Sequence, residues 1–414
     1  MPANSAPPGD RITRRQFLSR TAAAAGCLAL SAAHRVFAHP AGTGPQGAEP
    51  LLSASPSSLT RPAGAAPKVV HVFDPFATAW DYASGWYGDY VSQPEVDKMV
   101  DEGLMALTAT SSPAAAWQSL IPGYAPGERV AIKVNLNNAR EVADSDNVLD
   151  ALIEPVNRVI WGLKEIGVAE SDIWVFDAVR YIPDRFRNGC DYPQVNFSGT
   201  NINPLGFSST ERVVFAPPAS VPPLLDQPIS QVLVDARYLI NMPIMKKHSH
   251  AYVTLSFKNH FGTIQNCAAV HDPTFPDNAT YTPDYSGLVD IYKHPQIAGK
   301  TVLTIGDGLF ASRYDQSSVP VPWATFGNRA PNSLFFSLDP VAIDCVMYDF
   351  LEAEAGVPSA ADDYLALAAQ AGLGAFEHRA PGSTGPADWY SLIDYVYLDL
   401  WQPTHRVYVP SVQQ

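Results

Sequence analysis

Residues Arg129–Val134, with the sequence RVAIKV, run directly into the polar stretch Asn135-Leu136-Asn137-Asn138. A short β-branched run of this kind predicts a buried strand. A second run, Ile173-Trp174-Val175-Phe176, ends in the same way at Asp177. Between the two, apolar residues recur at helical spacing from Val148 to Ile166. This strand–helix–strand order favours an α/β fold with a largely parallel sheet.

The same alternation continues on both sides of this segment. The further strands that we expect are Val69–Phe73, Gln231–Val234, Tyr238–Ile240 and Thr301–Ile305, the last ending at Gly306-Asp307, and the further helices are Pro94–Leu107 and Pro340–Glu354. We therefore expect one α/β domain over residues 68–405, in which helices flank the sheet and two lobes enclose a cleft. Residues 406–414 are expected to form a tail.

Polar side chains follow several predicted strands at their carboxyl ends. Lys133 with Asn135, Asp177 and Asp307 hold such positions. In open parallel sheets, ligands bind beyond the carboxyl ends of the strands. Three strands that end in this way predict a shared polar cleft. Each residue taken alone also fits a helix cap or a turn.

The densest chemistry lies between residues 246 and 271. This segment holds three of the nine lysines of the chain and four of its ten histidines, namely Lys246, Lys247, Lys258, His248, His250, His260 and His271. Because the whole chain carries a formal net charge of -14, the segment is a local electropositive site. Ammonium groups and imidazoles suit a small anionic ligand, and neutral imidazoles also suit a divalent metal ion.

Lys258 follows the apolar run Ala251–Phe257, so we expect it at the edge of the core. Burying a lysine is unfavourable unless the ammonium is paired or its pKa falls. A lowered pKa makes a lysine a nucleophile or a general base. The alternative is a solvated turn at Lys246–His250, with the ammonium of Lys258 reaching solvent along its aliphatic stem.

Two functions follow from these residues. In the first, the chain is an enzyme that acts on a small anionic substrate such as a carboxylate. Its catalytic residues are Lys258 and Lys246, which bind charge or act as nucleophile, and His248 as the general acid–base, while Lys133, Asn135, Asp177, Asn259 and Asp307 bind or orient the ligand. In the second, a non-catalytic protein holds a metal through His248, His250, His260 or His271. A partner-binding surface protein is a third class.

Cysteine content and motifs argue against other classes. Beyond residue 38 the chain has three cysteines, Cys190, Cys267 and Cys345, with no CxxC spacing. They allow one disulfide but neither a four-thiolate zinc site nor an iron–sulfur cluster. We find no nucleotide-binding motif and no GxSxG or HExxH sequence. The acidic balance of the chain argues against nucleic-acid binding.

The N-terminal residues predict export. Thr13–Ser19 contains adjacent arginines followed by Phe-Leu, Ala22–Ala33 is mildly apolar, and Val36-Phe37-Ala38 fits a cleavage site. We expect residues 1–38 to be a twin-arginine signal peptide that engages the twin-arginine translocase, and residues 39–67 to be a Pro/Gly/Ala/Ser-rich linker. The mature chain is then periplasmic or extracellular. It has no run of about eighteen apolar residues, so we expect no membrane span.

The motifs together resemble the family called domain of unknown function 362. The resemblance rests on residues 133–137 (KVNLN), 240–243 (INMP) with the lysines and His248 that follow, Thr254 with 257–262 (FKNHFG), Asp307-Gly308, and 338–344 (LDPVAID). These motifs occur in the family's order and cover about residues 68–380. Some members add a cysteine-rich ferredoxin module, which this chain lacks, so the resemblance implies no iron–sulfur cluster here.

A weaker similarity is to the nickel-pincer lactate racemases, in which a histidine stands ten residues before a cofactor-linking lysine. His248 and Lys258 have that spacing, and His271 follows as a metal-ligand histidine does there. The glycine-rich stretch before the lysine is missing, and at Asp177 no counterpart of the racemase's other catalytic histidine is found. The similarity therefore implies a shared two-lobed scaffold more than a shared reaction.

Overall fold

The computed structural model describes residues 65–401 except 145, 316 and 384, all of them within one compact unit. The predicted signal peptide, the linker up to residue 64 and the tail lie outside the described residues. The strands are β1 (Lys68–Phe73), β2 (Arg129–Val134), β3 (Ile173–Phe176), β4 (Asn196–Ser198), β5 (Phe207–Val213), β6 (Gln227–Ser230), β7 (Ala236–Met242), β8 (Ile244–His248), β9 (Tyr252–Thr254), β10 (Thr301–Ser312), β11 (Ser333–Ser337) and β12 (Asp394–Asp399). The α-helices are α2 (Gln93–Thr108), α3 (Pro113–Leu120), α4 (Ile153–Glu165), α5 (Asp184–Asn188), α6 (Gln231–Asp235), α7 (Ser256–Asn259), α8 (Gly287–Lys293), α9 (Pro295–Ala298), α10 (Pro340–Ala355) and α11 (Asp363–Gln370).

A mixed sheet organises these elements. Its strand order is β12-β1-β11-β10-β7-β2-β3-β4, with β8 pairing both β10 and β9 beside this path. From β10 to β4 all neighbours are parallel, and β1 is parallel to β12. Strand β11 is antiparallel to both of its neighbours, β1 and β10. The expected α/β fold with a largely parallel sheet is confirmed.

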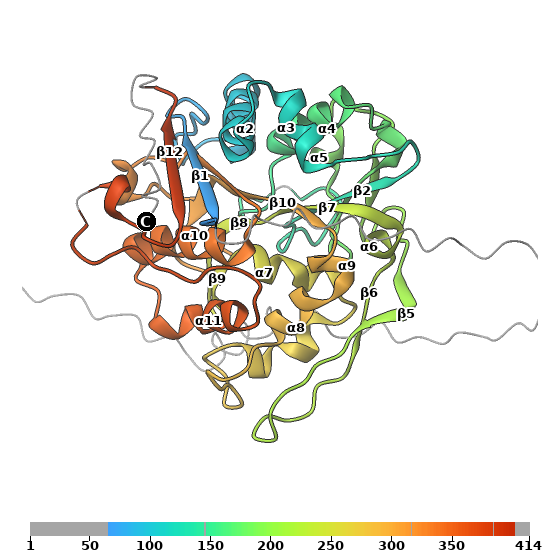
Figure 1. Ribbon diagram of the computed structural model, residues 1–414. Coiled ribbons are helices and arrows are strands. Elements are labelled where there is room, and N and C mark those ends of the chain that lie inside the picture. The colour runs from blue at the N-terminus through green and yellow to red at the C-terminus, as the bar shows by residue number, and fades with distance from the viewer. Residues whose placement is uncertain (1–64, 145, 316, 384, 402–414) are drawn as a thin grey trace, which may run out of the picture. The chain divides into compact units, whose positions relative to one another are not determined.

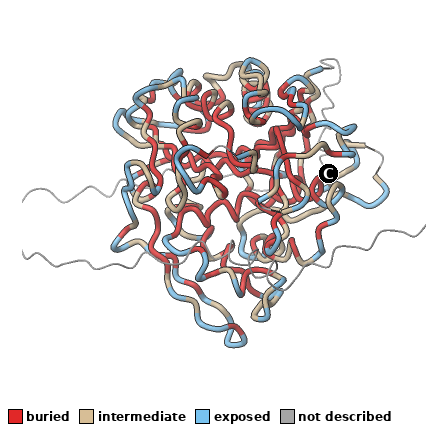
Figure 2. The backbone as a smooth tube through the Cα atoms, turned by 180° about the vertical axis from the view of Figure 1, so that it is seen from behind, coloured by how far each residue is buried: buried red, intermediate tan, exposed pale blue. Residues whose placement is uncertain are grey.

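Helices cover both faces of the sheet (Figure 1). Helices α2 to α5 lie on one side, and α7 to α11 lie on the other. Successive side chains of a strand point to opposite faces, so each strand contributes side chains to the core on either face of the sheet. In β2, Val130 and Ile132 belong to the core under α2 and α4, whereas Ala131 belongs to the core under α10. Figure 2 shows the buried residues concentrated in the strands and in the helices that cover them.

Most of the predicted elements are confirmed within a few residues. Strands β1, β2, β3 and β7 and helices α2 and α10 lie where the sequence pattern places them. The predicted helix Val148–Ile166 is α4, but it begins at Ile153. The residues before it are held in another conformation, because the Ala151 N–H donates to the Asn135 carbonyl at 2.9 Å. None of the described helices combines the length and the apolar character needed to span a membrane.

The predicted strand Gln231–Val234 is wrong, because these residues begin helix α6. The side-chain amide of Gln231 donates to the Asp235 carboxylate at 2.6 Å, a contact between residues four apart that is typical of a helical turn. Val232 and Leu233 are buried beneath the sheet. A run of four apolar residues does not distinguish a buried strand from a buried helical turn.

The predicted end of a strand at Gly306-Asp307 is also wrong, because β10 continues to Ser312. Its two glycines stay inside the strand because methionine side chains pack against them. A Cβ atom on Gly306 would lie 2.4 Å from the sulfur of Met347, and one on Gly308 would lie 3.0 Å from the terminal methyl of Met245. Asp307 therefore occupies the middle of a long strand.

The expected division into two lobes is not found. The described residues form one unit around one principal sheet, with a two-stranded β5–β6 ribbon beside it. The helices of both faces pack against the same continuous set of strands, so the chain offers no boundary between lobes.

Strands β7 and β8 form almost one strand, interrupted at Pro243, which has no backbone N–H. The Pro243 carbonyl accepts the N–H of Asp307 at 2.8 Å and keeps the chain beside β10. Met242 pairs with Val134, the last residue of β2. Strand β8 therefore carries Lys246 and His248 past the carboxyl end of β2.

Candidate functional site

A cavity of about 60 Å³ lies at the carboxyl ends of β2 and β3. Space of this size admits several water molecules or a ligand of a few heavy atoms. Its wall is polar on most sides and comes from β8, β9, α7 and the loops that follow β2, β3 and α7. The lining residues are Asn135, Asn137, Asp177, Val179, Arg180, His248, Thr254, Lys258, Asn259, Phe261, Gly262, Cys267 and His271.

An ion pair forms the floor of this cavity. The Lys133 ammonium lies 3.1 Å from the Asp177 carboxylate, and both side chains are buried. Lys133 also donates to the Val134 carbonyl at 2.6 Å and to the Asn259 side-chain oxygen at 3.2 Å. Burial lowers the pKa of Lys133, against the attraction of Asp177. Lys133 therefore neutralises Asp177 from below and does not itself line the cavity.

Gly262 packs directly on this ion pair. A Cβ atom there would lie 2.5 Å from the Lys133 nitrogen and 2.6 Å from an Asp177 carboxylate oxygen. Its carbonyl accepts the N–H of Ala178 at 2.9 Å, which brings the two loops together. The FKNHFG sequence needs a glycine at this position because two segments of chain and an ion pair meet there.

Helix α7 is one turn long and presents Lys258 to the cavity. Its own residues provide no side-chain cap. The Asp344 carboxylate on α10 takes that role, accepting the N–H of Ser256 at 2.8 Å and that of Phe257 at 3.3 Å. Tyr364 donates its hydroxyl to the same carboxylate at 3.1 Å, and burial raises the pKa of Asp344 to about 7. A remote helix thus holds the lysine in place.

Two asparagines fix the other end of α7. The Asn259 amide donates to the Asn241 side-chain oxygen at 2.7 Å and to the Lys133 carbonyl at 3.3 Å. Asn241 in turn donates to the Ser256 carbonyl at 3.1 Å. Asn259 was predicted to bind ligand, and although it lines the cavity, these bonds engage its amide. In the structure, the hydrogen bonds of Asn259 join α7 to the cavity floor.

Among the residues that the structure describes, Lys258 is a buried lysine without a carboxylate partner. Its side chain is 8% exposed, and no hydrogen bond or ion pair to its ammonium occurs among the described residues. The nitrogen lies 5.3 Å from the ring centre of Phe261 and 5.5 Å from that of Phe275. Burial lowers the pKa of Lys258 to about 7; Cys267 opposes this shift, while the positive charges of Lys246 and Arg180 add to it.

His248 is buried in the wall with its tautomer set by the backbone. Its Nδ1 accepts the N–H groups of His250 and Ala251, each at 3.1 Å, so the neutral ring carries its proton on Nε2. Burial lowers the pKa of His248 well below 6.5, and the charge of Lys258 lowers it further. The ring is therefore neutral at pH 7 and offers a hydrogen-bond donor.

His271 lies in the same wall between two aromatic rings, 5.1 Å from Phe261 and 4.9 Å from Phe275 between ring centres. No hydrogen bond to either ring nitrogen occurs among the described residues. Burial lowers the pKa of His271 to about 3, with Lys258 as the second cause. Its neutral ring therefore has one donor and one acceptor nitrogen available.

Arg180, Asn137 and Cys267 line the cavity but were not predicted as site residues. Arg180 donates to the backbone carbonyl of Asn137 at 2.9 Å and to its side-chain oxygen at 3.0 Å. Both residues stand a few positions beyond a predicted strand end, so extending the carboxyl-end argument into the loops would have found them. Nothing in the sequence pattern singles out Cys267.

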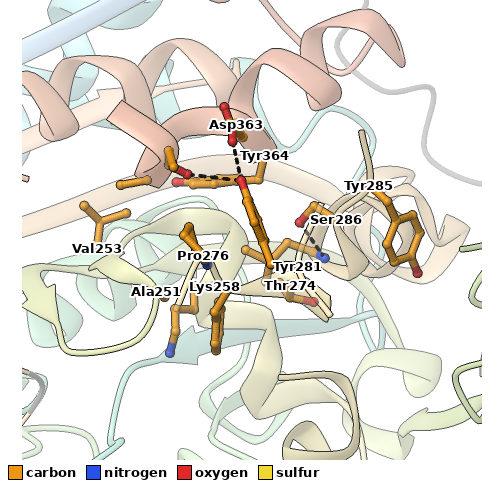
Figure 3. Close-up of a pocket in the computed structure, with 14 residues that line it drawn as sticks. Ala251, Val253, Lys258, Thr274, Pro276, Tyr281, Tyr285, Ser286, Asp363 and Tyr364 are labelled. Carbon is orange, nitrogen blue, oxygen red and sulfur yellow. Dashed lines mark hydrogen bonds between the residues drawn. The ribbon is translucent and has the colours of Figure 1, made fainter. Parts of the chain in front are cut away.

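A second, smaller cavity of about 10 Å³ lies on the other side of Lys258. It is bounded mainly by apolar and aromatic side chains, and the Tyr281 hydroxyl there donates to Asp363. Figure 3 shows the amine end of Lys258 directed away from Tyr281 and Asp363. The aliphatic stem of Lys258 therefore lies against the apolar side, and its nitrogen belongs to the polar cavity.

A family model described as domain of unknown function (DUF362) matches residues 130–349, more than half of the chain. The chain belongs to the DUF362 family. The DUF362 segment runs from β2 to α10 and contains every residue that lines the polar cavity, together with Asp344. No curated protein matches the chain.

Two of the DUF362 motif residues predicted for the site lie elsewhere. Lys246 turns away from the cavity and donates to the Leu149 carbonyl at 2.9 Å. Burial lowers its pKa, against the attraction of Asp150. Asp307 accepts the N–H of Leu309 at 3.0 Å, and burial raises its pKa to about 7. Because β10 does not end at Asp307, this carboxylate remains within the sheet.

The four histidines predicted as metal ligands do not converge. His248 and His271 line the cavity, His250 is exposed, and His260 is buried against Tyr292 with both ring nitrogens unpaired. In the part of the chain that the structure describes, no three His, Cys, Asp or Glu side chains are grouped so that they could hold a metal ion. His248 is the last residue of β8 and His250 lies in the turn that follows, with their ring centres 6.1 Å apart.

Proposed function

We propose that this DUF362 protein is an exported enzyme that binds a small carboxylate-bearing anion in the polar cavity. Lys258 and Arg180 hold the charge of the anion. The imidazole of His248 donates a hydrogen bond, and that of His271 transfers a proton. The cavity admits a ligand of a few heavy atoms, which limits the substrate to a small molecule.

The charge of the cavity wall carries this proposal. Asp177 is the only carboxylate among the lining residues, and Lys133 already neutralises it at 3.1 Å. Arg180 and Lys258 line the same wall, and Lys258 has no carboxylate partner among the described residues of a chain whose net charge is -14. A buried cation without a counter-ion is unfavourable by itself, and an anionic ligand removes that cost.

The wall also has the groups that acid–base chemistry needs. A general base requires a free lone pair within reach of the substrate, and His271 keeps one because its ring makes no hydrogen bond to a described residue. The backbone occupies Nδ1 of His248, so in its neutral form this ring orients or polarises the substrate. This division of roles differs from the expectation that His248 is the general acid–base.

Export is the part of the proposal that depends on the sequence alone. Residues 1–38 carry the paired arginines, the apolar stretch and the cleavage site of a twin-arginine signal. Fractionation of cells that express the full chain checks it: mature protein beginning at His39 outside the cytoplasm supports export, and uncleaved protein in the cytoplasm contradicts it.

Anion binding can be measured by calorimetry and thermal melting with acetate, pyruvate, sulfate and phosphate. We expect a small carboxylate to bind and to raise the melting temperature, because a ligand that binds only the folded state stabilises it. Lys258→Met should weaken this binding by about tenfold or more, since a charge-assisted hydrogen bond is lost.

Lys293→Met is the matched control, because Lys293 is an exposed lysine on the neighbouring helix α8. It should bind the anions as the unmodified protein does. Absence of binding to every anion, or equal loss in the two variants, contradicts the proposed site. A bound carboxylate that is always recovered unchanged by NMR after long incubation points to a binding protein instead of an enzyme.

A further inference from the structure

Lys258 presents a free amine to the cavity rather than one half of an ion pair. It is more than nine-tenths buried, and its nitrogen meets aromatic rings on one side and the open cavity on the other. The positive charges of Lys246 and Arg180 lower its pKa further, whereas Cys267 opposes the shift. Desolvation and neighbouring positive charge both favour the neutral amine, whose lone pair is a nucleophile.

A lysine that only binds anions is best kept charged, and a carboxylate beside it would do so. Here the nearby carboxylate, Asp177, is instead paired with Lys133 on the cavity floor. The structure thus gives the permanent positive charge to Arg180 and leaves Lys258 able to react. The two groups line the same small cavity, so one small molecule can meet both.

We propose, on the basis of the anion site described above, that Lys258 forms a Schiff base with a small 2-oxo carboxylate whose carboxylate group is bound by Arg180. The substrate class is therefore a carbonyl compound with an adjacent carboxylate, of the size of pyruvate or glyoxylate. The short carbon chain of such a molecule fits against Phe261, which lines the cavity beside Lys258.

The reaction balances without any further reagent. The Lys258 nitrogen attacks the carbonyl carbon, and the carbonyl oxygen becomes a hydroxyl group as it takes up a proton from the amine. The C–O bond then breaks, the hydroxyl group leaves as water with the second amine proton, and a C=N bond remains. No electron donor or acceptor takes part, and water is the leaving group.

The histidines of the wall divide the proton transfers. His271 has an unused acceptor nitrogen that can take a proton from the attacking amine and return it to the departing oxygen. His248 offers only its Nε2–H, since its Nδ1 accepts two backbone N–H groups. That donor suits the carbonyl oxygen, on which negative charge develops during the attack.

Borohydride trapping tests the inference on the intact chain. The protein is incubated with pyruvate, reduced with sodium borohydride, and examined by intact mass and peptide mapping. We expect one adduct, heavier than the protein by pyruvic acid less one oxygen atom, on the peptide that contains Lys258. Acetate, which has the carboxylate but no carbonyl, should compete, and acetone, which has the carbonyl but no carboxylate, should give little adduct.

Two variants locate the groups involved. Lys258→Arg keeps the positive charge but should lose the adduct completely. Arg180→Gln should lower the yield at low pyruvate concentration by about tenfold, because a charge-assisted contact to the carboxylate is removed, whereas Arg180→Lys should retain part of it. Circular dichroism shows whether each variant is folded, and the acetate competition needs no variant at all.

The outcomes separate this inference from the proposed function. Anion binding by calorimetry without any adduct overturns the Schiff base and leaves the anion site intact. Absence of both binding and adduct overturns both. Adducts on exposed lysines such as Lys293 overturn the inference, because they show only the general reactivity of amines. An adduct on Lys258 whose yield is not lowered by acetate overturns it for the same reason.

Discussion

The histidines of the cavity and His378, near the C-terminal end of the described chain, lie in opposite environments. His378 is held between two carboxylates, 2.6 Å from Asp349 and 2.8 Å from Asp362. Burial alone would lower the pKa of His378, but these hydrogen bonds outweigh it and raise the pKa to about 9. The cavity histidines have no carboxylate partner among the described residues, and burial lowers the pKa of His271 to about 3.

The difference shows how one residue type serves two purposes in this chain. Around His378 the polar groups satisfy one another, and Tyr390 and the Arg379 N–H also donate to Asp349. Because these groups hydrogen-bond to one another, the network stabilises the fold and leaves few donors or acceptors for a ligand. In the cavity wall, Lys258 is buried and His271 is half-buried, and both have polar atoms that no described residue satisfies. Unused hydrogen-bonding capacity in a buried place is what a binding site requires.

The largest expected effect on stability comes from the ion pair of Lys133 and Asp177 at the floor of the cavity. Lys133→Met leaves the buried carboxylate of Asp177 without its ion-pair partner, so we expect a loss of about 3–5 kcal/mol in the free energy of unfolding. Urea unfolding measures it. The control is Arg129→Met in the same strand, where the ion pair with Asp235 is exposed at the surface; it should cost about 1 kcal/mol or less. Similar losses in the two variants would mean that the floor is not a structural element.

A middle-sized effect should separate the two kinds of histidine directly. His378→Phe removes hydrogen bonds to two carboxylates and should lower the free energy of unfolding by about 1.5–3 kcal/mol. His271→Phe removes no protein hydrogen bond and places a phenyl ring among aromatic neighbours, so its effect should stay within about 1 kcal/mol. The same substitution thus reports on both regions. Equal losses in the free energy of unfolding in the two variants would show that the two histidines do not differ in this way.

The dependence on pH should differ in sign at these two positions. The folded-state pKa of His378, about 9, exceeds the unfolded value of 6.5, so its contribution is complete below pH 6.5 and is lost as the pH rises through about 9. The destabilisation by His378→Phe should shrink over that range. The folded-state pKa of His271 is about 3, so acidification below pH 6.5 favours the unfolded state, and His271→Phe should gain stability relative to the unmodified protein there.

The smallest expected effect concerns ligand affinity. Burial lowers the pKa of Lys258 to about 7, and an anion that binds by charge alone prefers the protonated form. Acetate binding should therefore weaken as the pH rises above 7, by up to about tenfold per pH unit. Calorimetry at a series of pH values checks it. In Lys258→Arg, which stays charged, affinity should not change over this range; a parallel decline would assign the titration to another group.

The sequence pattern predicts the parts of the fold in which local periodicity and tertiary packing agree. Strands β2 and β3 are apolar runs that end in polar residues, and the polar residues do meet at the carboxyl edge of the sheet. Lys258 at the end of an apolar run is buried, as expected. The placement of Asp307 could not be predicted, because β10 is continued past Gly306 by its pairing with β11 and β8, which are distant in sequence or follow a different strand.

Other features depend on contacts between residues far apart in the chain. The direction of Lys246 is set by a carbonyl in the loop after β2, and the isolation of His260 by its place beneath the sheet. His378 and its two carboxylates come from three separate segments with no common spacing. Arg180 follows a strand end but is brought to the cavity by its bonds to Asn137. The hydrophobic periodicity of the sequence does not predict contacts of this kind.

The cap that Asp344 provides for α7 affects the order in which parts of the chain can fold during synthesis. Ser256 and Asp344 stand 88 positions apart, so the segment bearing Lys258 leaves the ribosome well before the carboxylate that secures it. A nascent chain that stops short of α10 has the asparagines that fix one end of α7 but lacks the carboxylate that caps its first turn. If Lys258 reacts as proposed, we expect it to do so only after synthesis has passed residue 344 and α10 has packed against α7.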